Sequence, residues 1–326
     1  MNQPWKIFLI FRLPLALLFL IGFIEFAAYS LSTTPKLRHP LDRLVANIDS
    51  WPGDSETVLL GDSVTQDVAW TYKLAPRNSL ANLTTNQASG LIGSYLLLKR
   101  YLKIHNSPRR ILIASTPEFF SYSPNPQTAE IYLNTVFERE AEVKELQAAG
   151  ITVVRDRWKP AILNLENKIF DRIAALMFSK APSKEKLPIS NNLPQQTLAD
   201  VKPKFLDKYL ALRATSDLKL SKNSKHSIKK LCELSKIHKF QIIFIWAPVP
   251  NSVLEIWNGD ARLSKLGENI KIATDELCFD TKFFDINQNV TFPDYAFRDP
   301  DHLRRPYWTM LYAKTLRNLI GGNISF

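Results

Sequence analysis

The sequence predicts an α/β fold in which helices cover both faces of a parallel β-sheet. Two kinds of segment alternate along the chain and indicate this class. Short, continuously apolar runs are typical of strands buried on both faces, and the stretches between them carry apolar residues at helical spacing. The predicted strands are residues 58–60, 110–114, 240–247 and 283–286. The predicted helices are residues 90–103, 263–278 and 305–319.

Each of these elements has its own signal. The first strand, Val-Leu-Leu, runs into Gly61, and the strand at 110–114 is apolar after its first residue. The strand at 240–247 is stopped by Pro248, which cannot continue a sheet ladder. The helix at 90–103 is amphipathic, and its apolar positions are Leu91, Tyr95, Leu98 and Leu102.

The chain has 326 residues, of which 45% are hydrophobic, so it can form one large domain or one domain plus an insertion. We expect an N-terminal anchor at residues 1–31, a tether at 32–52 and an α/β domain at 53–326. The strand–helix pattern is interrupted at about residues 120–221. An insertion of this size builds either a lid or partner surface, or a purely structural cap. Its predicted parts are helices at 129–149 and 160–178 and a polar, flexible loop at 180–196.

The N-terminal segment at residues 8–31 is almost wholly apolar, and its only charges are Arg12 and Glu25. About 20 apolar residues span the hydrocarbon core of a bilayer, so this segment predicts a single transmembrane helix. The alternative is a cleaved signal peptide, with its apolar region at 13–24 and small residues for cleavage at 28–30. Both interpretations place the remainder outside the cytoplasm, in the periplasm or at the cell surface.

The formal net charge of +11 is compatible with nucleic acid, anionic lipid, an acidic polysaccharide or a solvated basic face. The Lys and Arg residues are scattered, and the sequence contains no nucleic-acid-binding motif. Export also makes nucleic acid an unsuitable partner. We therefore expect contact with the membrane through the N-terminal helix, and an anionic glycan or envelope polymer as substrate.

The two cysteines, Cys232 and Cys278, fall in separate predicted helices. In an oxidising compartment they form a disulfide, and otherwise they are two buried thiols. The sequence has no C-x-x-C motif and no Cys/His cluster, so it predicts no metal site and no cofactor.

Two short motifs at opposite ends of the domain carry the predicted chemistry. Gly-Asp-Ser at residues 61–63 ends the first predicted strand, and Asp-Pro-Asp-His at 299–302 precedes the last predicted helix. Together they hold a serine, a carboxylate and an imidazole in the order Ser…Asp…His. These are the three side-chain types of a serine-nucleophile triad, so a fold that joins the motifs would perform acyl chemistry.

A serine hydroxyl is a poor nucleophile until a correctly oriented base takes its proton. We expect His302 to be this base for Ser63, and Asp299 to hold the imidazole through its Nδ1–H. The backbone N–H of Ser63, at the start of a helix, would face the developing oxyanion. The alternatives are an ordinary turn with an unrelated surface histidine, or a metal site of Asp299, Asp301 and His302. For Asp301, the sequence also allows a helix N-cap or a plain surface charge.

On these two motifs, the sequence resembles the SGNH (GDSL-like) hydrolases from about residue 55 onward. The resemblance implies a flavodoxin-like three-layer α/β/α sandwich with Ser63, Asp299 and His302 as the catalytic triad. It also implies that a glycine N–H contributes to the oxyanion hole, and Gly90 matches that glycine best.

The sequence departs from this family after the third strand. The family has Gly-x-Asn there, whereas this chain has Ala-Ser-Thr-Pro-Glu at residues 114–118. One expected oxyanion donor is therefore missing from its usual position, and Asn86 is the candidate to replace it. The departure puts the usual lipase or thioesterase activity in doubt.

An N-terminal anchor, an SGNH-like body and a changed third block resemble the branch of the family that acts on cell-envelope polymers. That branch includes the D-alanyl transfer protein of teichoic acid synthesis and the alginate O-acetylation proteins. It implies a membrane-bound O-acyltransferase as partner. The sequence thus predicts a membrane-anchored serine esterase or O-acyltransferase that acts on an extracytoplasmic glycan through an acyl-serine intermediate. The alternative is a catalytically degenerate binding or assembly module of an envelope polysaccharide complex.

Overall fold

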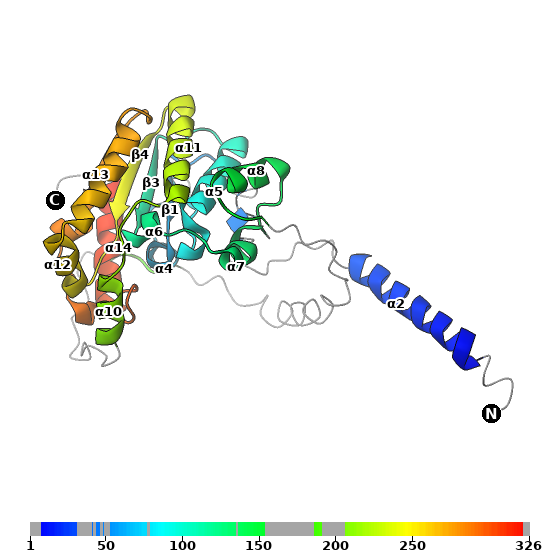
Figure 1. The fold of residues 1–326 in the computed structure, drawn as a ribbon. Coiled ribbons are helices and arrows are strands. Elements are labelled where there is room, and N and C mark those ends of the chain that lie inside the picture. The colour runs from blue at the N-terminus through cyan, green and yellow to red at the C-terminus, as the bar shows by residue number, and fades with distance from the viewer. Residues whose placement is uncertain are drawn as a thin grey trace. The chain divides into compact units, whose positions relative to one another are not determined.

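A computed structural model describes most of the chain, and the chain divides into two compact units (Figure 1). One unit comprises Met1–Arg43 with Arg155–Glu185, and the other comprises Leu44–Val154 with Lys186–Phe326. The described residues are 8–30, 41, 44–45, 48, 53–76, 79–134, 136–153, 186–190 and 206–321.

In the first unit, the apolar N-terminal segment forms the π-helix η1 (Phe8–Arg12) and the α-helix α2 (Leu13–Ser30). Large apolar side chains such as Phe11 and Phe19 are exposed on these helices. Among the described residues, no helix is both long enough and apolar enough to span a bilayer, so the transmembrane helix expected at residues 8–31 is not found.

The second unit is built around a five-stranded sheet in which every strand pairing is parallel. The strand order is β2-β1-β3-β4-β5, and the central strands, in which most residues are Val, Ile, Leu or Phe, are buried. The register pairs Gly61 with Ala114 and Ala114 with Ile245, so the carboxyl ends of these strands lie at one edge. The strands are β1 (Thr57–Gly61), β2 (Leu80–Asn82), β3 (Arg110–Ser115), β4 (Gln241–Trp246) and β5 (Thr281–Asp285).

Helices cover both faces of the sheet, consistent with a three-layer α/β/α architecture. The connections from β2 to β3, β3 to β4 and β4 to β5 all advance in one direction, so right-handed crossovers place their helices on one face. These are α5 (Gly90–Ile104), α11 (Lys222–His238) and α13 (Arg262–Asp275), and α11 packs against both of the others (Figure 1). The β1-to-β2 connection runs the opposite way. Its helix α4 (Ser63–Thr71) packs against α14 (Tyr307–Ile320).

Shorter elements fill the connections between these layers. Those between β2 and α11 are η3 (Gln87–Ser89), α6 (Glu118–Ser121), α7 (Pro126–Ala129), η4 (Glu130–Asn134), α8 (Glu140–Ala148) and α10 (Leu206–Ala214). Those after β4 are α12 (Asn251–Gly259), η6 (Ile286–Gln288) and η7 (Asp294–Ala296).

Several sequence expectations differ from the structure within the insertion. The helix expected at residues 129–149 is divided into η4 and α8, and α8 restarts because the Glu142 carboxylate accepts a hydrogen bond from the N–H of Arg139. The helix expected at 160–178 lies outside the described residues. Of the loop expected at 180–196, the structure describes 186–190, where Leu187 forms a parallel bridge with Tyr72.

A disulfide joins Cys232, in α11, to Cys278. The second cysteine lies three residues beyond the end of α13 rather than inside a helix, which corrects the expected boundary. The bond ties α11 to the segment that leads into the edge strand β5. Of the two alternatives that the sequence left open, the structure has the disulfide.

Candidate active site

The site begins at the carboxyl end of β1, where Gly61 lies against β3. A Cβ at this position would overlap the carbonyl oxygen of Ala114 and lie 3.2 Å from Cβ of Thr65. The Gly61 carbonyl also accepts a hydrogen bond of 2.9 Å from the N–H of Thr85. Glycine is therefore required here because two neighbouring segments approach the backbone closely.

Asp62 fixes the turn that carries the serine. Its side chain caps α4, because Oδ1 accepts hydrogen bonds from the N–H groups of Val64 at 3.1 Å and Thr65 at 3.4 Å. Its other oxygen, Oδ2, accepts bonds from the N–H of Thr116 at 2.8 Å and from its Oγ1 at 2.9 Å. Burial raises the pKa of the Asp62 carboxyl, and the hydrogen bonds from Thr116 oppose this shift. Ser63 is thus held in the first turn of α4.

Hydrogen bonds between α4 and α14 bring the C-terminal motif to the serine. Thr65 Oγ1 donates to the carbonyl of Ala114 at 2.7 Å and lies 2.8 Å from the hydroxyl of Tyr312. A second contact lies at the C-terminal end of α4, where the hydroxyl of Tyr72 is 2.9 Å from Oγ1 of Thr309 in α14. The helix that begins at Ser63, α4, and the helix that follows His302, α14, are therefore joined through buried polar side chains.

The loop between η7 and α14 has the geometry that an Asp-x-x-His motif needs. The N–H of Arg298 donates to the carbonyl of His302 at 2.9 Å, which closes the loop. Inside it, Asp299 Oδ1 accepts bonds from the N–H of Asp301 at 3.0 Å and of His302 at 2.8 Å. The carboxylate thus organises the loop before it meets the imidazole.

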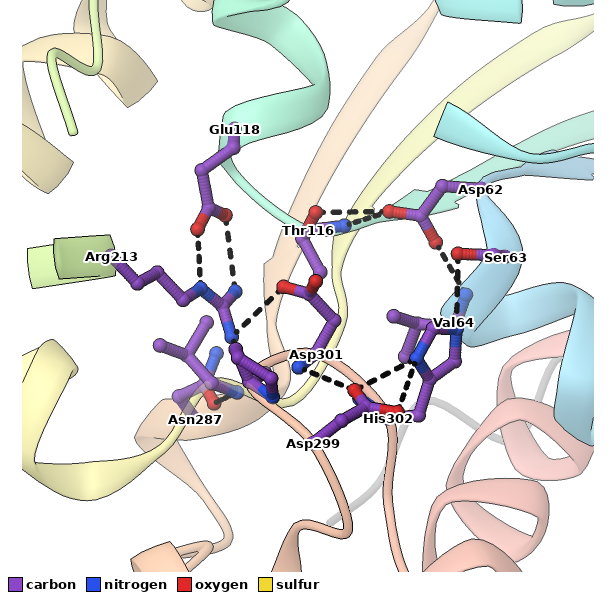
Figure 2. A network of polar contacts seen from close by, with 12 residues as sticks. Asp62, Ser63, Val64, Thr116, Glu118, Arg213, Asn287, Asp299, Asp301 and His302 are labelled. Carbon is purple, nitrogen blue, oxygen red and sulfur yellow. Dashed lines mark hydrogen bonds and ion pairs between the residues drawn. The ribbon is translucent and has the colours of Figure 1, made fainter. Parts of the chain in front are cut away.

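Ser63, His302 and Asp299 form a continuous chain of hydrogen bonds (Figure 2). His302 Nδ1 lies 2.9 Å from Asp299 Oδ1 and 3.1 Å from Oδ2, and His302 Nε2 lies 3.1 Å from Ser63 Oγ. The structure therefore brings together the three side chains that the two motifs supply, across 239 positions of sequence.

The protonation states suit a serine, a neutral base and an anionic carboxylate. Partial burial raises the pKa of Asp299, but hydrogen bonds from the side chain and the N–H of His302 outweigh it, and the net pKa lies well below the ordinary value. The hydrogen bond to Asp299 raises the pKa of His302 above 6.5, while burial opposes that shift. The carboxylate therefore stays ionised and strengthens the imidazole as a base.

The expected oxyanion donors differ in their placement. The N–H of Ser63 lies in the first turn of α4, where helical N–H groups have no intrahelical acceptor. The N–H of Gly90 instead donates to the carbonyl of Gln87, although the φ of Gly90, 59°, does require glycine. Asn86 directly follows Thr85, whose N–H donates to the carbonyl of Gly61.

The segment that follows β3 holds other parts of the site in place. Thr116, directly after β3, gives both of its donors to Asp62 rather than to a position beside the serine. Its neighbour Glu118 forms a bidentate ion pair with Arg213 of α10 (Figure 2). Functional groups in open α/β sheets follow the carboxyl ends of the strands, and this rule could have identified Thr116 and Glu118 from the sequence. Arg213 carries no such signal.

Asp301 is neither an N-cap nor an isolated surface charge. Its Oδ1 lies 3.4 Å from Arg213 Nη1, and its side chain is 43% exposed. Desolvation raises the pKa of its carboxyl, and the Arg213 charge opposes the shift. Among the described residues, no group of three or more His, Cys, Asp or Glu side chains is arranged to hold a metal ion. Asp299 and His302 pair with each other instead.

A pocket of about 460 Å³ adjoins the loop that carries Asp299 and His302. Pro300 and Asp301 of this loop line the pocket, and so do residues of η3, α6, α10 and the turn after α10. The lining includes Gln87, Glu118, Tyr122, Tyr209, Arg213 and Asp217.

No family model matches the sequence, and no curated protein matches it.

Proposed function

We propose that the protein is a serine esterase or O-acyltransferase of the SGNH type. The observation that carries this proposal is the hydrogen-bond chain from Ser63 Oγ through His302 to Asp299. Two features of the fold support it. The strand order 2-1-3-4-5 is that of flavodoxin-like sheets, and the serine follows the carboxyl end of a central strand.

Acylation follows from the geometry of the three side chains. Nε2 of His302 takes the proton of Ser63 as Oγ attacks the ester carbonyl carbon, and the carbonyl π electrons move to oxygen. When the tetrahedral intermediate collapses, the C–O bond to the leaving alcohol breaks, and Nε2–H returns the proton to that oxygen. Asp299 stays ionised and stabilises the imidazolium through Nδ1–H.

Deacylation repeats these steps with a new nucleophile. His302 removes a proton from water or from a sugar hydroxyl, whose oxygen attacks the acyl-serine carbon. Collapse then breaks the bond to Ser63 Oγ, which recovers its proton from Nε2. Water gives ester hydrolysis, and a sugar hydroxyl gives O-acyl transfer. In both half-reactions, the N–H of Ser63 and the side-chain amide of Asn86 are the proposed donors to the oxyanion.

The pocket beside the loop that carries Asp299 and His302 (the histidine loop) supports a hydroxyl-rich glycan as the substrate class. Tyrosine, serine and glutamine side chains in its lining can bond to sugar hydroxyls. The lining also carries the carboxylates of Glu118, Asp217 and Asp301 against the guanidinium of Arg213. This balance of charge favours an uncharged glycan and disfavours the anionic polymer that the net charge of the whole chain suggested.

The disulfide supports a location outside the cytoplasm, since such bonds persist mainly in oxidising compartments. The proposed substrate is therefore an ester-bearing glycan outside the cytoplasm.

The second candidate function is a non-catalytic binding module, and one observation favours it. The Gly90 N–H, which the SGNH family would use for the oxyanion, bonds to Gln87 here. Thr116, in the segment where that family has its asparagine, bonds to Asp62. Such a module would use the same pocket to bind glycan without turnover.

Labelling of the full chain with a fluorophosphonate separates the two functions. An enzyme reacts at Ser63, and Ser63→Ala abolishes the labelling without lowering the melting temperature. Absence of labelling in the folded wild-type protein would favour the binding module. Acetate release from an acetylated neutral oligosaccharide, compared with an acetylated polyuronate, then tests the substrate class, and a preference for the polyuronate would contradict it.

A further inference from the structure

Arg213 contacts the loop that carries Asp299 and His302. It lies in α10, the last described helix of the segment between β3 and α11, and its side chain is 6% exposed. Nε and Nη2 pair with the two carboxylate oxygens of Glu118, and Nη1 donates to the carbonyl oxygen of Pro300. Nη1 also lies 3.4 Å from Asp301 Oδ1.

These contacts hold the middle of the Asp-Pro-Asp-His loop. Pro300 and Asp301 are the two residues between Asp299 and His302. A guanidinium that donates to the Pro300 carbonyl and pairs with the Asp301 carboxylate therefore restrains the segment on which the Asp299 carboxylate and the imidazole depend. Figure 2 shows the Arg213–Asp301 pair beside Asp299 and His302. The other side of the loop is held by α4, where Asp67 pairs with Arg298 at 3.5 Å.

The Arg213 guanidinium is itself held in place. Burial lowers its pKa, but the Glu118 charge and hydrogen bonds outweigh this and raise the pKa overall, so the group stays charged. The guanidinium carbon also lies 5.6 Å from the ring of Trp257. A planar fork with several donors can bond to a carboxylate and a carbonyl at once, which the ammonium group of lysine cannot reproduce.

We propose that Arg213 is a positioning residue, which holds the Asp299–His302 loop so that the imidazole faces Ser63. It touches neither the nucleophile nor the base, and it acts through Pro300 and Asp301. The insertion between β3 and α11 thus completes the active site by supplying this side chain. The inference rests on the proposed function for its kinetic consequence, but its structural consequence is measurable without turnover.

The chain contains a matched control in Arg100. This arginine is also buried, pairs bidentately with Glu142, and donates to the backbone carbonyl of Val136 at 2.8 Å. Its guanidinium carbon lies 5.2 Å from the ring of Phe137. The two arginines therefore have the same kinds of contact, but only Arg213 contacts the histidine loop.

The experiment compares Arg213→Met and Arg213→Lys with Arg100→Met in the full chain. We expect the methionine variants to lose similar thermal stability. At a temperature where all are folded, fluorophosphonate should label Arg213→Met about 10²-fold more slowly than wild type, because small displacements in a catalytic geometry have effects of this size. The labelling rate of Arg213→Lys should lie between those of Arg213→Met and the wild type. Arg100→Met should be labelled at the wild-type rate.

A second measurement does not depend on catalysis. The Nδ1–H proton of His302 should give a downfield NMR signal, which Asp299→Asn assigns by its loss. We expect Arg213→Met to lose or broaden this signal and Arg100→Met to keep it. If Arg213→Met keeps both the signal and the labelling rate, the inference is wrong. If the wild type does not label but the signal still depends on Arg213, the proposed function fails and the positioning role stands.

Discussion

Replacement of Asp299 by Asn tests the triad with a change of one atom. Asp299 Oδ1 accepts bonds from the N–H groups of Asp301 and His302, so an Asn oxygen would stay there. The Asn amide nitrogen then takes the place of Oδ2, 3.1 Å from His302 Nδ1. That nitrogen is a donor and competes for Nδ1 with the Asn oxygen, which lies 2.9 Å away. It thereby favours the tautomer in which Nδ1 is an acceptor and Nε2 carries the proton. The imidazole can then no longer take the proton of Ser63.

The expected loss follows from this tautomer change. In serine triads it lowers the rate by about 10⁴-fold, or roughly 5 kcal/mol of transition-state stabilisation. The pH dependence should change as well. A general base acts when neutral, so wild-type kcat/KM should rise with pH through a pKa above 6.5, because Asp299 raises the pKa of His302. Without the carboxylate, the midpoint of the residual activity should move to lower pH.

The assay is kcat/KM for p-nitrophenyl acetate from pH 5 to 9, with Asp260→Asn, at an exposed position, as control. Thermal melts show whether the variant is folded. A wild-type rate for folded Asp299→Asn, or an unchanged pH midpoint, would refute the triad. The pH dependence of the free energy of unfolding gives an independent check. The lowered pKa of Asp299 contributes stability that is present above about pH 4 and lost as the pH falls further, so the destabilisation by Asn should vanish in acid.

Three further changes test the scaffold of the site. Asp62→Asn should cost about 1–3 kcal/mol and slow labelling, because its amide must face either the Thr116 N–H or the N–H groups at the start of α4; an unchanged urea midpoint would contradict this. Gly61→Ala should prevent folding or shift β1 from β3, since its Cβ meets the Ala114 carbonyl, and circular dichroism and labelling together detect either result. Cys232→Ser with Cys278→Ser should remove roughly 4 kcal/mol of stability for a loop of this length, while a folded sample still labels at Ser63.

The sheet could be predicted wherever burial on both faces leaves a continuous apolar run. The central strands β1, β3 and β4 have such runs, and the structure places each within one or two residues of its expected bounds. Strand β2 escaped prediction because it has only three residues, Leu-Ala-Asn, and pairs with one neighbour. Three residues are too few for either periodicity to be recognised.

The side chains that could be predicted are those whose chemistry depends on local spacing. Asp299 and His302 are close in sequence, and the turn that joins them is set by the same carboxylate that meets the imidazole. The partners that could not be predicted come from distant segments. Arg213 is 87 positions from Pro300 and 95 from Glu118, and nothing in the residues around it indicates either contact.

The topology explains how a long insertion and the hydrogen-bond chain from Ser63 through His302 to Asp299 coexist. The connections to β3, β4 and β5 place their helices on one face, which leaves the other face to α4 and α14. Thr65 and Tyr312 can therefore join the helix after Ser63 to the helix after His302, whatever the length of the chain between β3 and α11. On the inference drawn above, the insertion acts on His302 and Asp299 through the ion pair of Arg213 and Glu118, which lies at the carboxyl ends of the strands. Changes in the insertion that preserve this ion pair should therefore alter the pocket and its substrate preference, and leave the rate of fluorophosphonate labelling unchanged.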